Sequence, residues 1–177
     1  MSIRFEPLTR DDLPLLLAWL QKPHVAAWWR DLQTMEQVEA DHLPSIDGQE
    51  PSYHYVIVVD GRPVGMIQWY LASDFPEWEE IVHVGEGVAG VDLLIGEEDA
   101  VGRGLGAEVL RAFISDVVFA KEATHAVVAG IEAANTRSLR AFGKAGFLFA
   151  FDYEEEGRPH RLLRLERGRP RPSRGPC

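Results

Sequence analysis

The sequence predicts a mixed α/β domain, with a central and mostly antiparallel sheet of about seven strands flanked by four helices. Strand-rich runs and helix-periodic segments follow one another in the order β-α-α-β-β-β-α-β-α-β-β. Asp60-Gly61 lies between two apolar runs and is typical of a hairpin turn, which makes the flanking strands antiparallel. An apolar run at Val88–Ile95 leads through a glycine-rich loop into a helix, which indicates a crossover near that loop.

The first half of the chain supplies two helices and three strands. Each helix opens with the spacing of a capping box, Thr9 with Asp12 and Thr34 with Gln37. A polar loop is expected over 72–86. The expected elements are a strand at Ile3–Glu6, helices from Thr9 through Leu20 and from Thr34 through about His42, and strands at Tyr53–Val59 and Val64–Tyr70.

The second half supplies the other two helices. Asn135 is a good N-cap, and Gly146 ends its helix just before a new strand. After the strand at Val88–Ile95, the expected elements are a helix over Leu105–Phe119, a strand at Ala126–Ile131, the helix that starts at Asn135, and strands at Phe147–Tyr153 and His160–Arg167 joined over Glu154–Pro159.

Length and composition indicate one domain over residues 1–167. A chain of 177 residues, 46% of them hydrophobic, can build one core. Residues 168–177 are rich in Arg, Pro and Gly, so we expect a disordered tail. No run approaches the ~18 apolar residues of a membrane span, and the N-terminus lacks the apolar region of a signal peptide. The only cysteine, Cys177, cannot form an internal disulfide, which fits a cytoplasmic protein.

The charge is unevenly distributed. The formal net charge is −10, yet seven of the 18 basic residues lie beyond Gly157 with a single acid, Glu166. The body of the chain is therefore more acidic than the net value suggests, and it should repel nucleic acid and attract polycations. The six histidines are scattered without metal-ligand spacing, so we expect no metal.

A glycine-rich loop is the strongest functional signal. Its glycines, Gly102, Gly104 and Gly106, directly precede an amphipathic helix. Backbone N–H groups at such a helix start, together with the helix dipole, favour phosphate. The segment has neither the Gly-Lys-Ser/Thr ending of a P-loop nor the spacing of the Rossmann fingerprint. Arg103 and Leu105 lie between these glycines, so we assign the whole stretch 102–106 to cofactor binding.

Two motifs resemble those of the GNAT acyltransferases. Gly104 and Gly106 fill the glycine positions of the Q/R-x-x-G-x-G/A loop, while Val101 stands in the Gln/Arg position. Residues 135–147 are similar to the second signature, N-x-R-A-x-x-x-Y-x-K-x-GF, with Phe142 where the family has Tyr. The segments 23–29, 78–80 and 87–92 resemble the aminoglycoside 6′-N-acetyltransferases, and the resemblance extends to about Arg167.

The resemblance implies acetyl-coenzyme A as co-substrate. The loop would hold its pyrophosphate, its pantetheine would pair with the strand at Leu93, Leu94 and Ile95, and the Asn135 helix would flank it. A backbone N–H near Leu93 or Leu94 would hold the oxyanion. Since phenylalanine cannot donate a proton, Phe142 leaves the general acid for the thiolate unassigned.

Asp92 is the candidate general base. It interrupts the apolar run from Val91 to Ile95, where an ionised side chain is costly unless it is paired or needed. An alkyl ammonium must lose a proton before it can attack a thioester. The family resemblance places the equivalent aspartate beside the amine that is acetylated.

Tryptophans and acids are expected to bind a polycationic aminosugar. Sugar rings pack on indole faces, and ammonium groups pair with carboxylates. Trp28 and Trp29 cannot both face one core, so we expect one to be buried and one to line the cleft. The candidate substrate-binding residues are Trp28, Trp29, Asp74, Glu77, Trp78, Glu79, Glu80, Asp92 and Glu132.

The sequence therefore predicts an aminoglycoside 6′-N-acetyltransferase, acting as a monomer or homodimer without nucleic-acid or membrane partners. Three alternatives stay open. One is a siderophore-biosynthesis acyltransferase acting on hydroxylysine. Another is a non-catalytic acyl-coenzyme A-binding module, which Val101 and Phe142 would suit. The third is an N-terminal acetyltransferase for a basic ribosomal protein.

Overall fold

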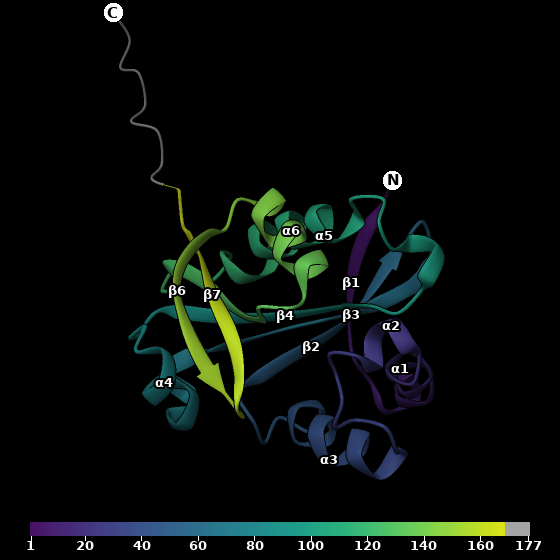
Figure 1. Cartoon of the computed structure of the whole chain (residues 1–177). Helices are drawn as coiled ribbons and strands as arrows, with labels where there is room; N and C mark the ends of the chain where they lie inside the picture. Colours follow the sequence, from purple (N-terminus) through teal and green to yellow (C-terminus); the bar gives the residue numbers. More distant parts are fainter. Residues whose placement is uncertain (169–177) are drawn as a thin grey trace, which may run out of the picture.

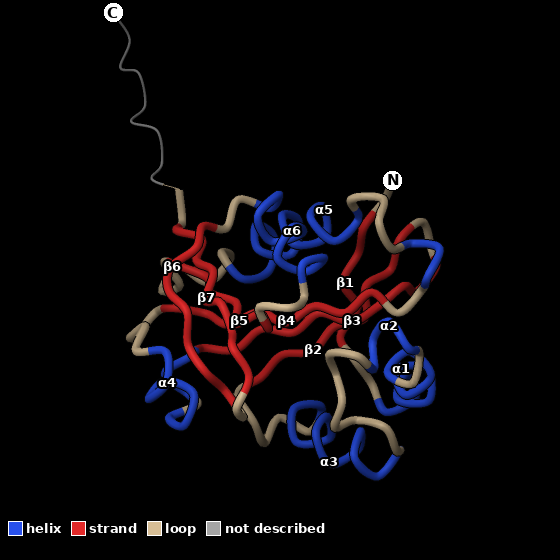
Figure 2. Tube along the Cα trace, viewed as in Figure 1, coloured by secondary structure: helices blue, strands red, loops and turns tan. Residues whose placement is uncertain are grey.

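A seven-stranded sheet in the order β1-β2-β3-β4-β5-β7-β6 runs through the computed structural model, which describes residues 1–168 (Figures 1 and 2). Among the strands of residues 1–168, β4–β5 is the only parallel pair of neighbours, so the prediction of a mostly antiparallel sheet of seven strands is confirmed. The strands are β1 (Ile3–Pro7), β2 (Ser52–Val59), β3 (Arg62–Leu71), β4 (Val88–Ile95), β5 (Ala126–Glu132), β6 (Leu148–Glu155) and β7 (Arg158–Glu166).

Helices cover both faces of the sheet (Figure 1). On one face, α5 and α6 cover a core that includes Phe113, Val91 and Val127. On the other, α1 and α3 pack on Val56, Met66 and Leu94, and α4 packs farther along. The helices are α1 (Leu13–Leu20), α2 (Pro23–Ala26), α3 (Met35–Ile46), α4 (Pro76–Val82), α5 (Leu105–Phe113) and α6 (Thr136–Ala145).

The helix starts and turns follow the sequence signals. Thr34 Oγ1 accepts from the Gln37 N–H at 3.2 Å, and Gln37 Oε1 accepts from the Thr34 N–H at 3.0 Å, so this predicted capping box is confirmed. Asp60-Gly61 forms the β2–β3 turn with both residues in the left-handed region, at φ 49° and 83°. The Glu98–Ala100 segment forms a 3-10 turn (η3) before the glycine-rich loop.

Two helices were missing from the prediction, so the expected count of four is wrong. The segment expected as a polar loop over 72–86 contains a 3-10 turn, η2 (Ala72–Asp74), and the helix α4, which begins at Pro76. The helix α2 likewise begins at a proline, Pro23. Both have fewer than eight residues, too few for an apolar periodicity to appear, but proline at the first helical position is itself a start signal.

Several boundaries also differ from the expectation. The helix expected from Thr9 begins as a 3-10 turn at Arg10–Asp12, and α1 itself starts at Leu13. The helix α3 continues through Ile46, past Pro44. The α5 helix passes at Ile114 into a π-helical turn, η4 (Ile114–Val118), which ends one residue before the expected Phe119. The β6–β7 turn is shorter than expected, because left-handed Glu156 and Gly157 close it in two residues.

The two central strands, β4 and β5, part soon after they meet. Their parallel pairing covers three residues of each strand, from Val88 to Gly90 and from Ala126 to Val128. Beyond Gly90, β4 remains paired with β3 alone. The backbone of residues 91–95 that faces β5 therefore has no strand neighbour, and this split is where the cavities described below lie.

A glycine after β4 is fixed by the packing of α1. A Cβ on Gly96 would lie 2.1 Å from Cγ of Trp19, a buried residue whose Nε1 donates to Glu97 Oε1 at 2.7 Å. We expect Gly96→Ala to cost about 1–3 kcal/mol, which lowers the melting temperature by about 2–12 °C. Gly143→Ala is the control, because a Cβ there meets nothing within 4 Å. A Gly96→Ala protein with the same melting temperature as the wild type would contradict this packing.

Within residues 1–168, no helix is long and apolar enough to cross a membrane. The predicted tail belongs almost wholly to residues 169–177, including Cys177, which lie outside the described residues.

Candidate active site

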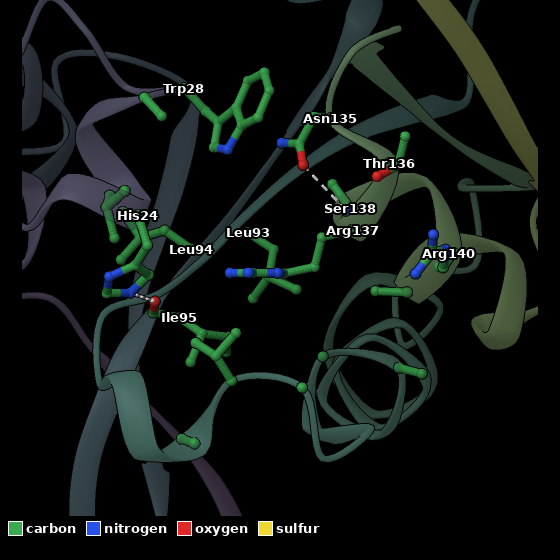
Figure 3. Close-up of a pocket in the computed structure, with 18 of the residues that line it drawn as sticks. His24, Trp28, Leu93, Leu94, Ile95, Asn135, Thr136, Arg137, Ser138 and Arg140 are labelled. Atoms are coloured by element: carbon green, nitrogen blue, oxygen red, sulfur yellow. Dashed lines mark hydrogen bonds between the residues drawn. The ribbon is translucent and has the colours of Figure 1, made fainter.

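A cavity of about 600 Å³ lies between the end of β4, the glycine-rich loop and the start of α6 (Figure 3). It brings together residues that are far apart in the sequence. Of the nine predicted cofactor residues, seven line it: Leu93, Leu94, Ile95, Gly102, Gly104, Gly106 and Asn135. The other two do not, because the side chain of Leu105 is buried in the core and Arg103 is exposed.

The glycine-rich loop has a backbone that requires glycine. Gly102 and Gly104 are left-handed, at φ 82° and 84°, and Gly104 is the N-cap of α5. Gly106 lies where α5 approaches α6, and a Cβ there would be 3.4 Å from Cβ of Ala141. The first N–H groups of α5 have no intrahelical acceptor, which makes this end of the helix suited to a phosphate oxygen.

Three cations on α6 line the same cavity and were not predicted as site residues. They are Arg137, Arg140 and Lys144, spaced by three and four positions so that they share one side of the helix. Arg137, labelled in Figure 3, lines the cavity together with Leu93. The i, i+3, i+7 spacing after an N-cap was the signal that could have found them.

The N-cap of α6 also borders the cavity. Asn135 Oδ1 accepts from the Ser138 N–H at 3.1 Å, which uses the amide oxygen for capping (Figure 3). Opposite it, Nε2 of His24 lies 3.0 Å from the carbonyl oxygen of Ile95, at the end of β4. His24 was not a predicted site residue, yet it lines the cavity and fixes the last carbonyl of the strand.

A second cavity of about 310 Å³ adjoins the first and contains Asp92. The two cavities share five lining residues: Trp28, Trp29, Leu93, Asn135 and Ser138. Side chains alternate along strands, so Asp92 on β4 and Glu132 on β5 point to the sheet face that α1–α4 cover.

Burial raises the pKa of Asp92 to about 6, although the hydrogen bond from Gln68 Nε2, at 3.0 Å, lowers it in part. Asp92 and Gln68 are directly opposite one another on β4 and β3. A carboxylate with a pKa near neutrality is suited to gain and lose a proton during a reaction. The geometry thus places a carboxyl group with a raised pKa in the cavity beside the basic one.

Two tyrosines pack against glycines of β4 and β5. Tyr70 lies over Gly90 and Tyr153 over Gly130, so that a Cβ on either glycine would be under 3 Å from the phenol. Tyr70 contacts the ring of Trp78 edge to face, with centroids 5.7 Å apart. Burial raises the pKa of Tyr153 well above its ordinary value, so its hydroxyl stays protonated.

The paired tryptophans differ from the expectation. Both are half-buried and both line the two cavities, so neither is fully buried in a core. Trp29 also packs against the cluster formed by α1 and α3.

Comparison with known proteins now decides the family. A model described as an acetyltransferase (GNAT) domain matches residues 9–154. The chain belongs to the GNAT acetyltransferase family. The aminoglycoside N(6′)-acetyltransferase type 1 proteins of Klebsiella pneumoniae and Serratia marcescens are each 30% identical over 151 residues, 82% of this chain and 74% of theirs.

Comparison with solved structures agrees with this family assignment. This GNAT chain is similar to AAC(6′)-Ib in complex with paromomycin and acetyl-CoA, with a TM-score of 0.85 and 28% identity over 94% of each chain. It is also similar to AAC(6′)-Ib with coenzyme A and kanamycin, with a TM-score of 0.84 and 28% identity over 94% of this chain and 95% of that one. The predicted fold class and enzyme class are confirmed.

Five predicted substrate residues of this GNAT domain lie outside both cavities: Asp74, Glu77, Trp78, Glu79 and Glu80. They belong to η2 and α4, which were expected as a loop. Glu79 accepts from the Gly85 N–H at 2.7 Å, and Trp78 packs near the cluster around Val82. Trp28, Trp29, Asp92 and Glu132 are the predicted substrate residues that the structure brings together.

Phe142, which stands in the position where the family signature has tyrosine, is buried against Phe147 and borders the second cavity. Its ring supplies an apolar wall and no proton. Among residues 1–168, no group of three or more His, Cys, Asp or Glu side chains could hold a metal ion.

Proposed function

We propose that this chain is an aminoglycoside 6′-N-acetyltransferase, which moves acetyl from acetyl-coenzyme A to a primary amine by direct attack. The observation that carries the proposal is Asp92, a carboxylate with a raised pKa, in a cavity that adjoins a second cavity lined by three cations. The relatives at 28–30% identity support the choice of substrate. A lone cysteine fits a cytoplasmic enzyme.

The basic cavity fits acetyl-coenzyme A. Arg137, Arg140 and Lys144 offer charge to its phosphates, and the N–H groups after Gly104 offer hydrogen bonds. The edge of β4 that faces β5 has no strand neighbour over 91–95, so it can pair with an extended pantetheine arm. When bound, the co-substrate supplies an activated acetyl thioester.

The residues of β4 would then carry out the proton chemistry. Asp92 takes the proton from the substrate ammonium, which leaves a neutral amine whose nitrogen forms the bond to the acetyl carbon. As the carbon–sulfur bond breaks, its electron pair leaves on the sulfur of coenzyme A, and the proton that the new amide nitrogen loses neutralises that thiolate, so the products are the acetamide and a free thiol. A backbone N–H of Leu93 or Leu94 donates to the oxygen that gains negative charge. Burial of Asp92 matters here, because a carboxylate with an ordinary pKa would accept the proton less readily.

The acceptor would occupy the second cavity. Trp28 and Trp29 offer indole faces for a sugar ring, and Glu132 offers a carboxylate for a further ammonium. The acidic body of the chain, with a net charge of −10 overall, would draw a polycation toward this cavity.

The test is release of free thiol from acetyl-coenzyme A with kanamycin or tobramycin, which carry a 6′-amine, against paromomycin, which has a 6′-hydroxyl. We expect turnover with the two amines and none with paromomycin. Turnover of hydroxylysine instead would indicate the siderophore alternative. Tight binding of acetyl-coenzyme A without turnover of any acceptor would indicate the non-catalytic module.

A further inference from the structure

An arginine is already paired with Glu132, the second carboxylate that lines the cavity containing Asp92. Arg30 Nη1 donates to Glu132 Oε2 at 2.8 Å, and its Nη2 lies 3.3 Å from Oε1 of the same carboxylate. The guanidinium carbon also lies 5.8 Å from the centroid of the Trp28 ring. Arg30 thus makes the two contacts, carboxylate and indole, that an ammonium group of an aminosugar would need.

The pair bridges two walls of the cavity. Arg30 lies in the segment after α2, and Glu132 ends β5. Trp28 and Glu132 both line the cavity that contains Asp92. The Arg30 side chain is about one third exposed and that of Glu132 is 17% exposed, so the pair sits at the mouth of the cavity, where another cation can compete for Glu132.

The arginine is not needed to hold its own segment in place. Gln33 Nε2 donates to the carbonyl oxygens of Leu20, Trp29 and Leu32, at 3.1–3.2 Å. Trp29 and Leu32 pack against the α1–α3 cluster. The backbone on both sides of Arg30 is therefore fixed by contacts that do not involve its guanidinium.

We infer that Arg30 is a tethered competitor for the acceptor's second ammonium group: it occupies the Glu132–Trp28 corner in the free enzyme and is displaced when a polyamine binds. The inference rests on the proposed function, because it assigns a place to a second amine of that acceptor while Asp92 faces the first. It follows that Arg30 weakens the binding of acceptors with several amines, whose second ammonium must displace it, and leaves the binding of a single amine placed at Asp92 unchanged.

The two partners of the pair should therefore have opposite effects on binding. Titration calorimetry of kanamycin into the coenzyme A-saturated protein measures this without turnover. We expect Arg30→Met to lower the Kd by about three- to tenfold, because the corner is vacated. We expect Glu132→Gln to raise the Kd by about threefold or more, because the carboxylate is lost. When Glu132→Gln is already present, adding Arg30→Met should not lower the Kd for kanamycin further.

Two controls make the result specific. Arg10→Met removes another arginine that is paired with a carboxylate: Arg10 Nη2 donates to the two carboxylate oxygens of Asp47 at 2.8 and 2.6 Å. Neither residue lines a cavity, so this substitution should leave the Kd for kanamycin unchanged. 6-Amino-6-deoxyglucose, with one amine, should bind Arg30→Met and wild type equally.

If the pair is only a structural strap, both substitutions weaken kanamycin binding and lower the melting temperature. That result, or an unchanged Kd in Arg30→Met, overturns the inference, while turnover of kanamycin by the wild type would still uphold the proposed function. If neither the wild type nor Arg30→Met binds or acetylates kanamycin, both the inference on Arg30 and the proposed function are overturned.

Discussion

Asp92→Asn should lower kcat for kanamycin by about 10²–10⁴-fold, the range that a positioned general base contributes. Asparagine keeps the size of the side chain and can still accept from Gln68, 3.0 Å away, but it cannot take a proton. Steady-state kinetics measure the loss. The KM for acetyl-coenzyme A should stay within about twofold, because Asp92 lies in the second cavity and does not line the basic one.

The same residue sets an expected pH dependence. With a pKa of about 6, Asp92 is ionised above that pH and protonated below it, so kcat/KM should fall as the pH drops through 6. Asp152→Asn, at an exposed carboxylate on β6, is the matched control and should leave the profile unchanged. A wild-type profile that is flat between pH 5 and 7 would contradict the role of Asp92.

As the pH rises through about 6, the free energy of unfolding should fall while kcat/KM rises. The folded-state pKa of Asp92 lies above the ordinary value of 3.8, so the protonated form favours the fold. That stabilisation is fully present below the unfolded pKa and is lost as the pH rises through about 6. Asp92→Asn should therefore melt higher than wild type at pH 8, by up to a few degrees.

Arg137→Ala should raise the KM for acetyl-coenzyme A by about 10–100-fold, the worth of one charge-assisted contact to phosphate. Arg137 lines the basic cavity (Figure 3). The KM for kanamycin should change far less. Arg4→Ala, at an exposed arginine on β1, is the control. Equal effects of the two substitutions would show that the basic cavity does not hold the phosphates.

The loss in Arg137→Ala should also depend on salt. Exposed phosphate contacts weaken as the ionic strength rises, so the ratio of the KM for acetyl-coenzyme A in Arg137→Ala to that in the wild type should shrink as salt is added. A ratio that does not change with salt would place Arg137 in a structural role instead.

The sheet and its order of elements could be predicted because each signal was local. The capping box at Thr34, the turn at Asp60-Gly61 and the helix end at Gly146 each act over a few residues. The helices α2 and α4 could not be found from periodicity, because each is shorter than two full repeats. The helix α3 ran past Pro44, although proline in a helix interior usually ends it.

The candidate site was predicted in part for the same reason. Asp92 and the glycines of the loop stand out in the sequence, because a charge in an apolar strand and glycines at a helix start are both unusual. The contacts of Tyr70 with Gly90 and of Arg30 with Glu132 join residues 20 and 102 positions apart, and no local pattern announces them. Such partners emerge only when the sheet is assembled.

The most direct single measurement is the structure of the product that the wild type makes from kanamycin and acetyl-coenzyme A, determined by NMR. We expect one acetyl group, on the 6′-nitrogen. An acetyl group on any other amine, or on a hydroxyl, would contradict the assignment of Asp92 and its cavity to the 6′-amine.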